Sequence, residues 1–153
     1  MSHQEFELTA YCGLYCGDCI RYNSKAVDLA GELWHELRRS QFNKYAEVKS
    51  KSVKELEYYD ECCRVLETIA ELKCTSPCRL GGDGCVPSCK IKKCIKSNGK
   101  QGCWPCPKME KCTKLDFLKP FHGEGPRENL RKIQKHGLSK WAKHRGKFYS
   151  WSR

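Results

Sequence analysis

Cysteine is the residue that most constrains this chain, because thirteen of its 153 residues are cysteines and eleven of these are clustered. Three lie at C-x3-C-x2-C spacing in YCGLYCGDC, at Cys12, Cys16 and Cys19. The other eight lie in the second half of the sequence, at Cys74, Cys78, Cys85, Cys89, Cys94, Cys103, Cys106 and Cys112. Disulfide frameworks and metal sites are the two scaffolds that use thiols this densely.

Metal ligation is favoured over disulfides by the cysteine count and by the rest of the sequence. The count is odd, so at least one thiol stays unpaired in any disulfide framework. The first ten residues, MSHQEFELTA, are polar and are not typical of a signal peptide. No apolar run approaches the length of about 18 residues that a membrane span requires. We therefore expect a cytoplasmic protein without membrane attachment, in a reducing compartment that disfavours disulfides.

The kind of site follows from the ligand chemistry. No histidine lies within either cysteine cluster, and all-thiolate sites suit structural zinc and iron–sulfur clusters. CGDC and CWPC each place two thiols on one tight turn, so that both can bind a single ion. A tetrahedral site takes four ligands, so eleven thiols predict about two zinc ions. A [4Fe-4S] cluster is the alternative cofactor, since spacing alone does not separate the two.

We expect metal ligands at nine of the clustered cysteines: Cys12, Cys16, Cys19, Cys85, Cys89, Cys94, Cys103, Cys106 and Cys112. Cys74 and Cys78 are the next candidates. Cys62 and Cys63 lie outside the clusters on a predicted helix, where we expect buried apolar thiols, with a ligand role for one of them as the alternative. The histidines are dispersed and expected at the surface or at helix ends, and His122 is the nearest of them to the last cysteine.

Two enzyme classes share parts of these cysteine patterns. Radical S-adenosylmethionine enzymes use the spacing of the first cluster, but they need a barrel of alternating strands and helices, and this sequence shows no such alternation. Thioredoxin-type dithiol sites resemble CWPC, but they need a strand before the motif and a helix after it. No other catalytic constellation is evident, so we do not predict an enzyme.

The fold class predicted is mainly α, in a single domain over residues 1–153. A helical hairpin is expected over residues 23–73, with one amphipathic helix over Ser24–Arg39 and a second over Val53–Lys73. Ser52 and Glu55 predict a capping box at the start of the second helix. A connection containing a short helix is expected between them.

The remainder of the chain is predicted to be less regular. Glycines and prolines interrupt every possible long element in residues 74–112, so irregular loops organised by metal are expected there. Short helices are expected in the basic C-terminal segment, residues 119–153. Pro126 and Gly137 mark the first turn and the end of one of them. Trp141 is expected to dock this segment onto the rest of the domain.

The net charge of +11 is concentrated in the C-terminal segment, where ten Lys and Arg residues face two acids. A basic face favours polyanions, because binding releases condensed counterions. We therefore expect nucleic acid or an acidic protein as the partner of this segment.

Three motifs resemble an uncharacterised cysteine-rich prokaryotic family, domain of unknown function 3795. They are AYCGLYCGDCIRY (10–22), CKIKKCIKSNGKQGCWPCPKMEKC (89–112) and ENLRKIQKHGLSKW (128–141). Two positions differ from the family pattern. Five residues rather than four precede Cys112 in its motif, and Lys92 stands where Arg is common. The resemblance implies a cysteine-rich, zinc-binding domain and supplies no established reaction.

Overall fold

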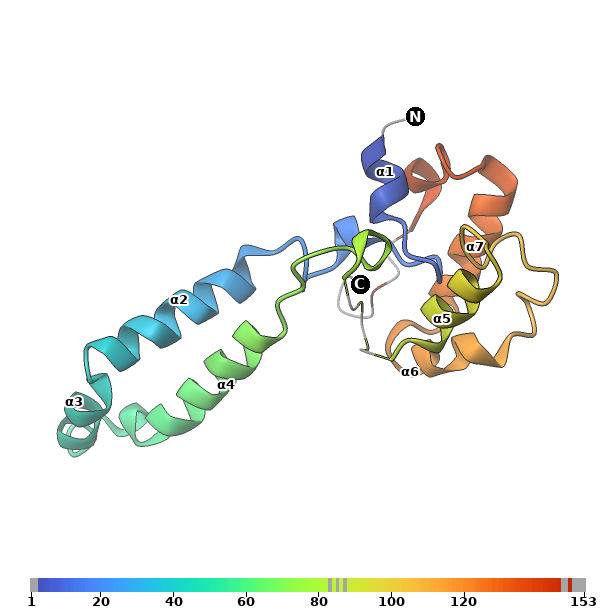
Figure 1. Cartoon of the computed structure of the whole chain (residues 1–153). Coiled ribbons are helices and arrows are strands. Elements are labelled where there is room, and N and C mark those ends of the chain that lie inside the picture. Colours follow the sequence, from blue (N-terminus) through green and yellow to red (C-terminus); the bar gives the residue numbers. More distant parts are fainter. Residues whose placement is uncertain (1–2, 83, 85, 87, 147–148, 150–153) are drawn as a thin grey trace. The chain divides into compact units, whose positions relative to one another are not determined.

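The protein is mainly helical, as predicted, and its contacts divide it into two compact units (Figure 1). The cysteine unit comprises Met1–Asp18 and Cys74–Arg153, and the hairpin unit comprises Cys19–Lys73. The computed structural model describes residues 3–82, 84, 86, 88–146 and 149. The single domain expected from the sequence stays a prediction.

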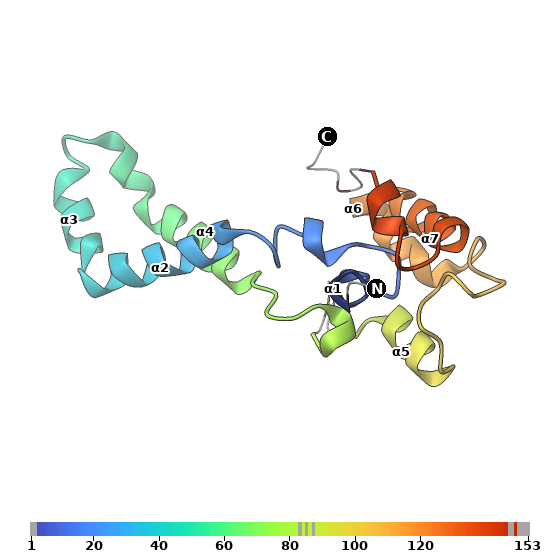
Figure 2. The same ribbon diagram turned by 90° about the horizontal axis from the view of Figure 1, so that it is seen from above.

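The hairpin unit has the predicted helical hairpin, with its elements in the order α2 (Lys25–Arg39), α3 (Phe42–Lys49), the 3-10 helix η2 (Lys54–Tyr58) and α4 (Tyr59–Glu71). Figures 1 and 2 show α2 and α4 side by side, with α3 at the end where the chain turns back. Ser24 caps α2, since its hydroxyl accepts a hydrogen bond from the Ala26 N–H at 3.1 Å. At the same end of α2, Lys73 Nζ lies 2.6 Å from a carboxylate oxygen of Asp28 in the first turn.

The helix predicted over Val53–Lys73 differs from the observed one at its start. The capping box is wrong: Val53 occupies the N-cap of η2 and makes no side-chain capping bond. The Ser52 hydroxyl instead donates to the carbonyl of Lys49 at the end of α3, at 3.1 Å. Serine hydroxyls compete for nearby backbone groups in this way, so the α-helix begins only at Tyr59.

Small residues form much of the seam between α2 and α4. Val27 and Ala30 are buried, whereas Leu29 and Leu33 of the same helix are exposed. A Cβ placed at Gly31 would lie only 3.5 Å from the Cβ of Ala70, so the glycine allows the two helices to approach closely.

Cys62 and Cys63 do not lie in this seam as expected. Cys62 is exposed and Cys63 is half-buried, and no residue of α4 is fully buried. The prediction of two buried apolar thiols is therefore wrong for Cys62.

The cysteine unit contains four α-helices and four 3-10 helices among its described residues, namely α1 (His3–Leu8), η1 (Cys16–Asp18), η3 (Cys78–Leu80), α5 (Lys90–Ser97), η4 (Thr113–Leu118), α6 (Lys119–His122), α7 (Gly125–His136) and η5 (Trp141–His144). Its core is formed by Ile91 and Ile95 of α5, Leu115 of η4 and Leu130 and Ile133 of α7, all buried.

Trp141 docks the C-terminal segment, as predicted. Its indole is fully buried and donates a hydrogen bond to Thr9 Oγ1 at 3.0 Å. The ring packs edge-on against Tyr15, with 5.8 Å between ring centroids. The Tyr149 hydroxyl donates to the Tyr15 carbonyl at 3.1 Å. These contacts attach the end of the chain to the loop that carries the first cysteines.

The predicted helix signals of α7 are confirmed. Pro126 lies in its first turn, and Gly137 follows its last residue with φ of +73°, a backbone conformation that favours glycine. None of the helices that the structure describes combines the length and the apolar character needed to cross a membrane.

Candidate metal centre

The buried thiol of Cys103 lies near several other cysteines of the described part of the chain. Burial, and then the nearby thiol groups, raise its pKa from 9.0 to about 12. The thiols that contribute belong to Cys112, Cys106, Cys94 and Cys89. Electrostatic effects of this kind act at short range, so five cysteines of the second motif lie near one another. We call them the Cys103 group.

A succession of backbone turns positions the later members of the Cys103 group. The Cys106 N–H donates to the carbonyl of Cys103 at 3.0 Å, and the Met109 N–H donates to that of Cys106 at 3.0 Å. The Cys112 N–H then donates to the Met109 carbonyl at 3.2 Å. CWPC therefore forms the tight turn that the sequence predicts. Two further backbone turns follow, and they place Cys112 near Cys103 and Cys106.

Cys89 and Cys94 join this group from α5. Cys89 occupies the N-cap position of the helix, and Cys94 lies one turn further along. The ammonium group of Lys114 lies 3.2 Å from Cys94 Sγ, and this hydrogen bond raises the pKa of Lys114.

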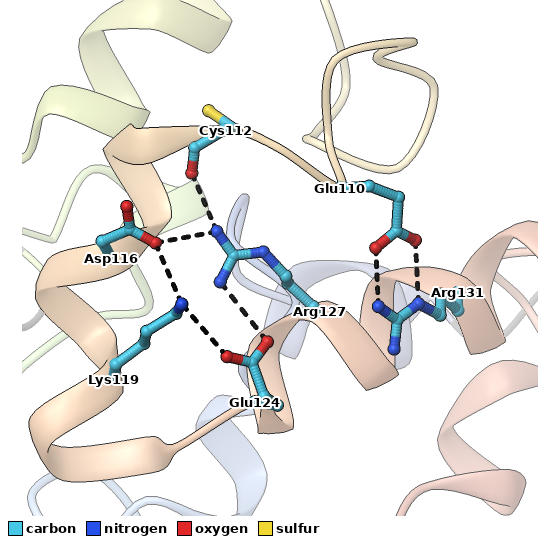
Figure 3. A network of polar contacts seen from close by, with 7 residues as sticks. All are labelled: Glu110, Cys112, Asp116, Lys119, Glu124, Arg127 and Arg131. Carbon is cyan, nitrogen blue, oxygen red and sulfur yellow. Dashed lines mark hydrogen bonds and ion pairs between the residues drawn. The ribbon is translucent and has the colours of Figure 1, made fainter.

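The backbone of Cys112 is held by a polar network around Arg127 (Figure 3). The guanidinium donates to the Cys112 carbonyl at 3.0 Å and to Asp116 at 2.9 Å, and it lies 3.5 Å from Glu124. Lys119 bridges the same two carboxylates, at 3.5 and 3.3 Å. The Arg127 side chain is 7% exposed, so the last cysteine of the motif is anchored to α7 by a buried group.

A second neighbourhood links the first cysteine motif to η3. Cys78 lies against the backbone N–H of Tyr11, and burial raises the pKa of its thiol. The Cys103 N–H donates to the Tyr11 carbonyl at 2.9 Å, so the peptide groups of Tyr11 contact both neighbourhoods. Cys89 interacts electrostatically with Cys78 as well as with Cys103.

Gly13 fixes the loop of the first motif onto α7. Its φ is +89°, and a Cβ there would lie 2.7 Å from the Pro126 carbonyl oxygen. Asn129 donates to the Gly13 carbonyl at 2.9 Å. The glycine after the first cysteine therefore permits a close approach of the helix, and the loop between Cys12 and Cys16 is held by packing.

The thiols are near one another without forming a closed ligand shell. Among the residues that the structure describes, no three Cys, His, Asp or Glu side chains are arranged to hold a metal ion. Cys19 begins the hairpin unit, and Cys85 lies outside the described residues. Cys74 donates its thiol proton to the Ser76 carbonyl at 3.2 Å.

Two residues that the sequence reasoning did not single out interact with the cysteines: Lys114 by a hydrogen bond and Arg79 electrostatically. Lys114 lies two positions after Cys112, and Arg79 directly follows Cys78. Their places beside cysteines are a local signal, but which sulfur a long side chain reaches depends on the fold. His122, expected at the surface or at a helix end, is the last residue of α6 and is buried. Its ring lies 5.1 Å from that of Tyr149, and burial lowers its pKa.

The fold and the thiols define a mainly helical, cysteine-rich protein. The chain belongs to the family described as Protein of unknown function (DUF3795), whose match covers residues 8–117. This range includes all eleven clustered cysteines, and it confirms the family resemblance of the first two motifs. The third motif, residues 128–141, lies beyond it. No curated protein and no solved structure matches the chain.

Proposed function

We propose that this protein binds metal through its cysteine thiolates and that the metal is structural zinc, about two ions per chain. The observation that carries the proposal is the proximity of four further thiols to the buried thiol of Cys103. Burial, and then the charges of nearby thiolates, disfavour the thiolate form of Cys103 and raise its pKa to about 12. A divalent cation would reverse this cost, because it binds thiols in their charged form.

The donor set fits such a site. The Cys103 group offers only sulfur ligands, which suit zinc or iron–sulfur clusters. We propose that the sulfur atoms reach coordination distance by rotation about the Cα–Cβ bonds. During this rotation the backbone turns and the Arg127 network keep the backbone of the later cysteines fixed. Cys12, Cys16, Cys19 and Cys85 stay proposed ligands of a second ion. A reducing cytoplasm would keep all of these thiols available.

An iron–sulfur protein is the alternative, with a role in electron transfer or redox chemistry. The same thiols serve both proposals, and the N–H and ammonium groups near Cys78 and Cys94 would suit the sulfurs of either site.

Purification without oxygen, followed by metal analysis and absorption spectroscopy, separates the two proposals. The zinc proposal requires a colourless protein with about two zinc ions. Stoichiometric iron and sulfide with a brown colour would establish the alternative, and a metal-free, fully reduced protein would reject both. Cys103→Ser should lose one ion. Cys62→Ser is the matched control, since Cys62 is exposed and outside the clusters.

Binding of a nucleic acid is a second candidate function, supported by the distribution of charge. The hairpin unit has ten basic and ten acidic residues, so the cysteine unit carries the whole net charge of +11. Residues 86–115 contain eight lysines and a single acid, Glu110, which is paired with Arg131. The basic C-terminal segment adds ten further cations.

A salt series with a single-stranded oligonucleotide tests this second function. Affinity should fall steeply as salt rises, because phosphate contacts release counterions. Affinity that is independent of salt would reject the proposal. Selective binding of an acidic polypeptide at equal charge would instead identify an acidic protein as the partner.

A further inference from the structure

Arg79 is enclosed by aromatic rings in the cysteine unit. The guanidinium carbon lies 4.3 Å from the ring centroid of Phe6, 4.7 Å from that of Tyr11 and 5.6 Å from that of Trp104. Its Nε donates to the Thr9 carbonyl at 2.9 Å. Three segments distant in sequence therefore meet around one cation, and together they fix the plane of the guanidinium.

This cation has no carboxylate partner within the described part of the chain. Its terminal nitrogen Nη2 is fully buried and makes no hydrogen bond to the described residues. A cation removed from water costs free energy unless an anion or hydrogen-bond acceptors replace the lost hydration. Aromatic rings replace only part of the lost hydration. Within the described residues, the surroundings of Arg79 therefore lack a negative group.

The groups able to supply that charge are thiols. The guanidinium interacts electrostatically with Cys78 and Cys16, and with the hydroxyl of Tyr11. A thiol becomes an anion when it binds metal, and four thiolates around one divalent ion leave a net charge of about −2. Arginine suits this place because its planar group stacks on aromatic rings while its N–H groups remain available to an acceptor.

We propose that Arg79 is the counter-charge and positioning residue of an anionic metal–thiolate site that includes Cys16 and Cys78. The inference rests on the proposed metal binding and deepens it in two ways. It adds Cys78 to the nine ligands expected from the sequence. It also separates this site from the Cys103 group, so that the two ions would occupy different places in the cysteine unit.

The test uses two substitutions with opposite expectations. Arg79→Met keeps a long apolar side chain that packs on aromatic rings and removes the charge, whereas Arg79→Lys keeps the charge and loses the planar group. Zinc affinity of the full-length protein is measured by competition with a chromophoric chelator. Arg79→Met should weaken one of the two sites by about 10- to 100-fold and leave the other unchanged. Arg79→Lys should reduce the zinc affinity of that site much less than Arg79→Met does.

The unaffected second site serves as an internal control for folding. Arg131→Gln is the matched arginine control, because Arg131 pairs with Glu110 at the surface, and it should bind zinc as the wild type does. Cys78→Ser should abolish the same site that Arg79→Met weakens, and this result decides the matter if Arg79→Met does not fold. Equal affinity of Arg79→Met and wild type, or full zinc content in Cys78→Ser, would overturn the inference. A wild type without any metal would overturn the proposed function together with it.

Discussion

Cys103 links the burial of one thiol to the pH dependence of stability. Its pKa is raised from 9.0 to about 12, mainly by burial. The folded protein therefore keeps this thiol protonated at pH values where the unfolded chain has lost the proton. Deprotonation stabilises the unfolded state first, so stability is present below about pH 9 and declines above it. Burial raises the pKa values of Tyr15 and Cys78 too, which reinforces the trend.

We predict that metal-free protein loses stability between about pH 9 and pH 12 and that Cys103→Ser reduces this loss. Urea unfolding followed by circular dichroism at several pH values measures it. Cys62→Ser should leave the pH dependence unchanged, since that thiol is exposed. The prediction fails if the slopes of Cys103→Ser and wild type coincide.

Arg127 illustrates how a residue without ligand chemistry can support the candidate site. It is buried and donates to the carbonyl of Cys112, as seen in Figure 3. Arg127→Met should destabilise the protein by about 2 kcal/mol, because the Cys112 carbonyl and Asp116 lose the charged donor that they share. Urea denaturation measures the change. Arg131→Gln breaks a fully surface pair and should have no measurable effect. Equal losses in the two variants would contradict a special role of Arg127.

At the level of elements, the helix signals that could be predicted are those satisfied within a few residues. Ser24, Pro126 and Gly137 act on backbone groups nearby, and each lies where the sequence placed it. Ser52 carried an equally plausible signal, but its hydroxyl had another acceptor in the preceding helix. The Ser52 side chain could bond either to the next helix or to the end of α3. The capping pattern alone does not say where α3 ends, so it does not decide between these two partners.

The two serines make a paired prediction about helix stability. Ser24→Ala should destabilise the protein by about 1 kcal/mol, because the Ala26 N–H at the start of α2 loses its acceptor. Ser52→Ala should change stability much less, since its hydroxyl only donates to an exposed carbonyl. Thermal unfolding of both variants gives the comparison. A larger loss for Ser52→Ala would restore the capping box.

The candidate site shows the same division between local and distant information. The turn at Cys103 and Cys106 follows from Pro105 and the short spacing, and it could be predicted. The approach of Lys114 to Cys94 and of Arg79 to three aromatic rings could not. These contacts join segments far apart in the sequence, so they exist only after the helices have packed.

For the whole molecule, charge and thiols are distributed together. The cysteine unit has ten of the thirteen cysteines and all of the net charge, whereas the hairpin unit is neutral. Every proposed ligand except Cys19 belongs to the cysteine unit, so bound metal would act mainly on that unit. Tetrathiolate sites would also add negative charge there, which offsets part of the repulsion between the lysines of residues 86–115.

This separation predicts the response to metal removal. Chelation of zinc from full-length protein should accelerate amide hydrogen exchange in α5, α7 and the turns at residues 103–112, because metal binding adds to the stability of the elements it connects. Exchange in α2 and α4 should change little, since their contacts with each other involve no proposed ligand. Mass spectrometry of peptides from both units measures the two rates in one sample. Equal acceleration in α2 and α5 would show that the units open together, and the metal would then stabilise the chain as one cooperative domain.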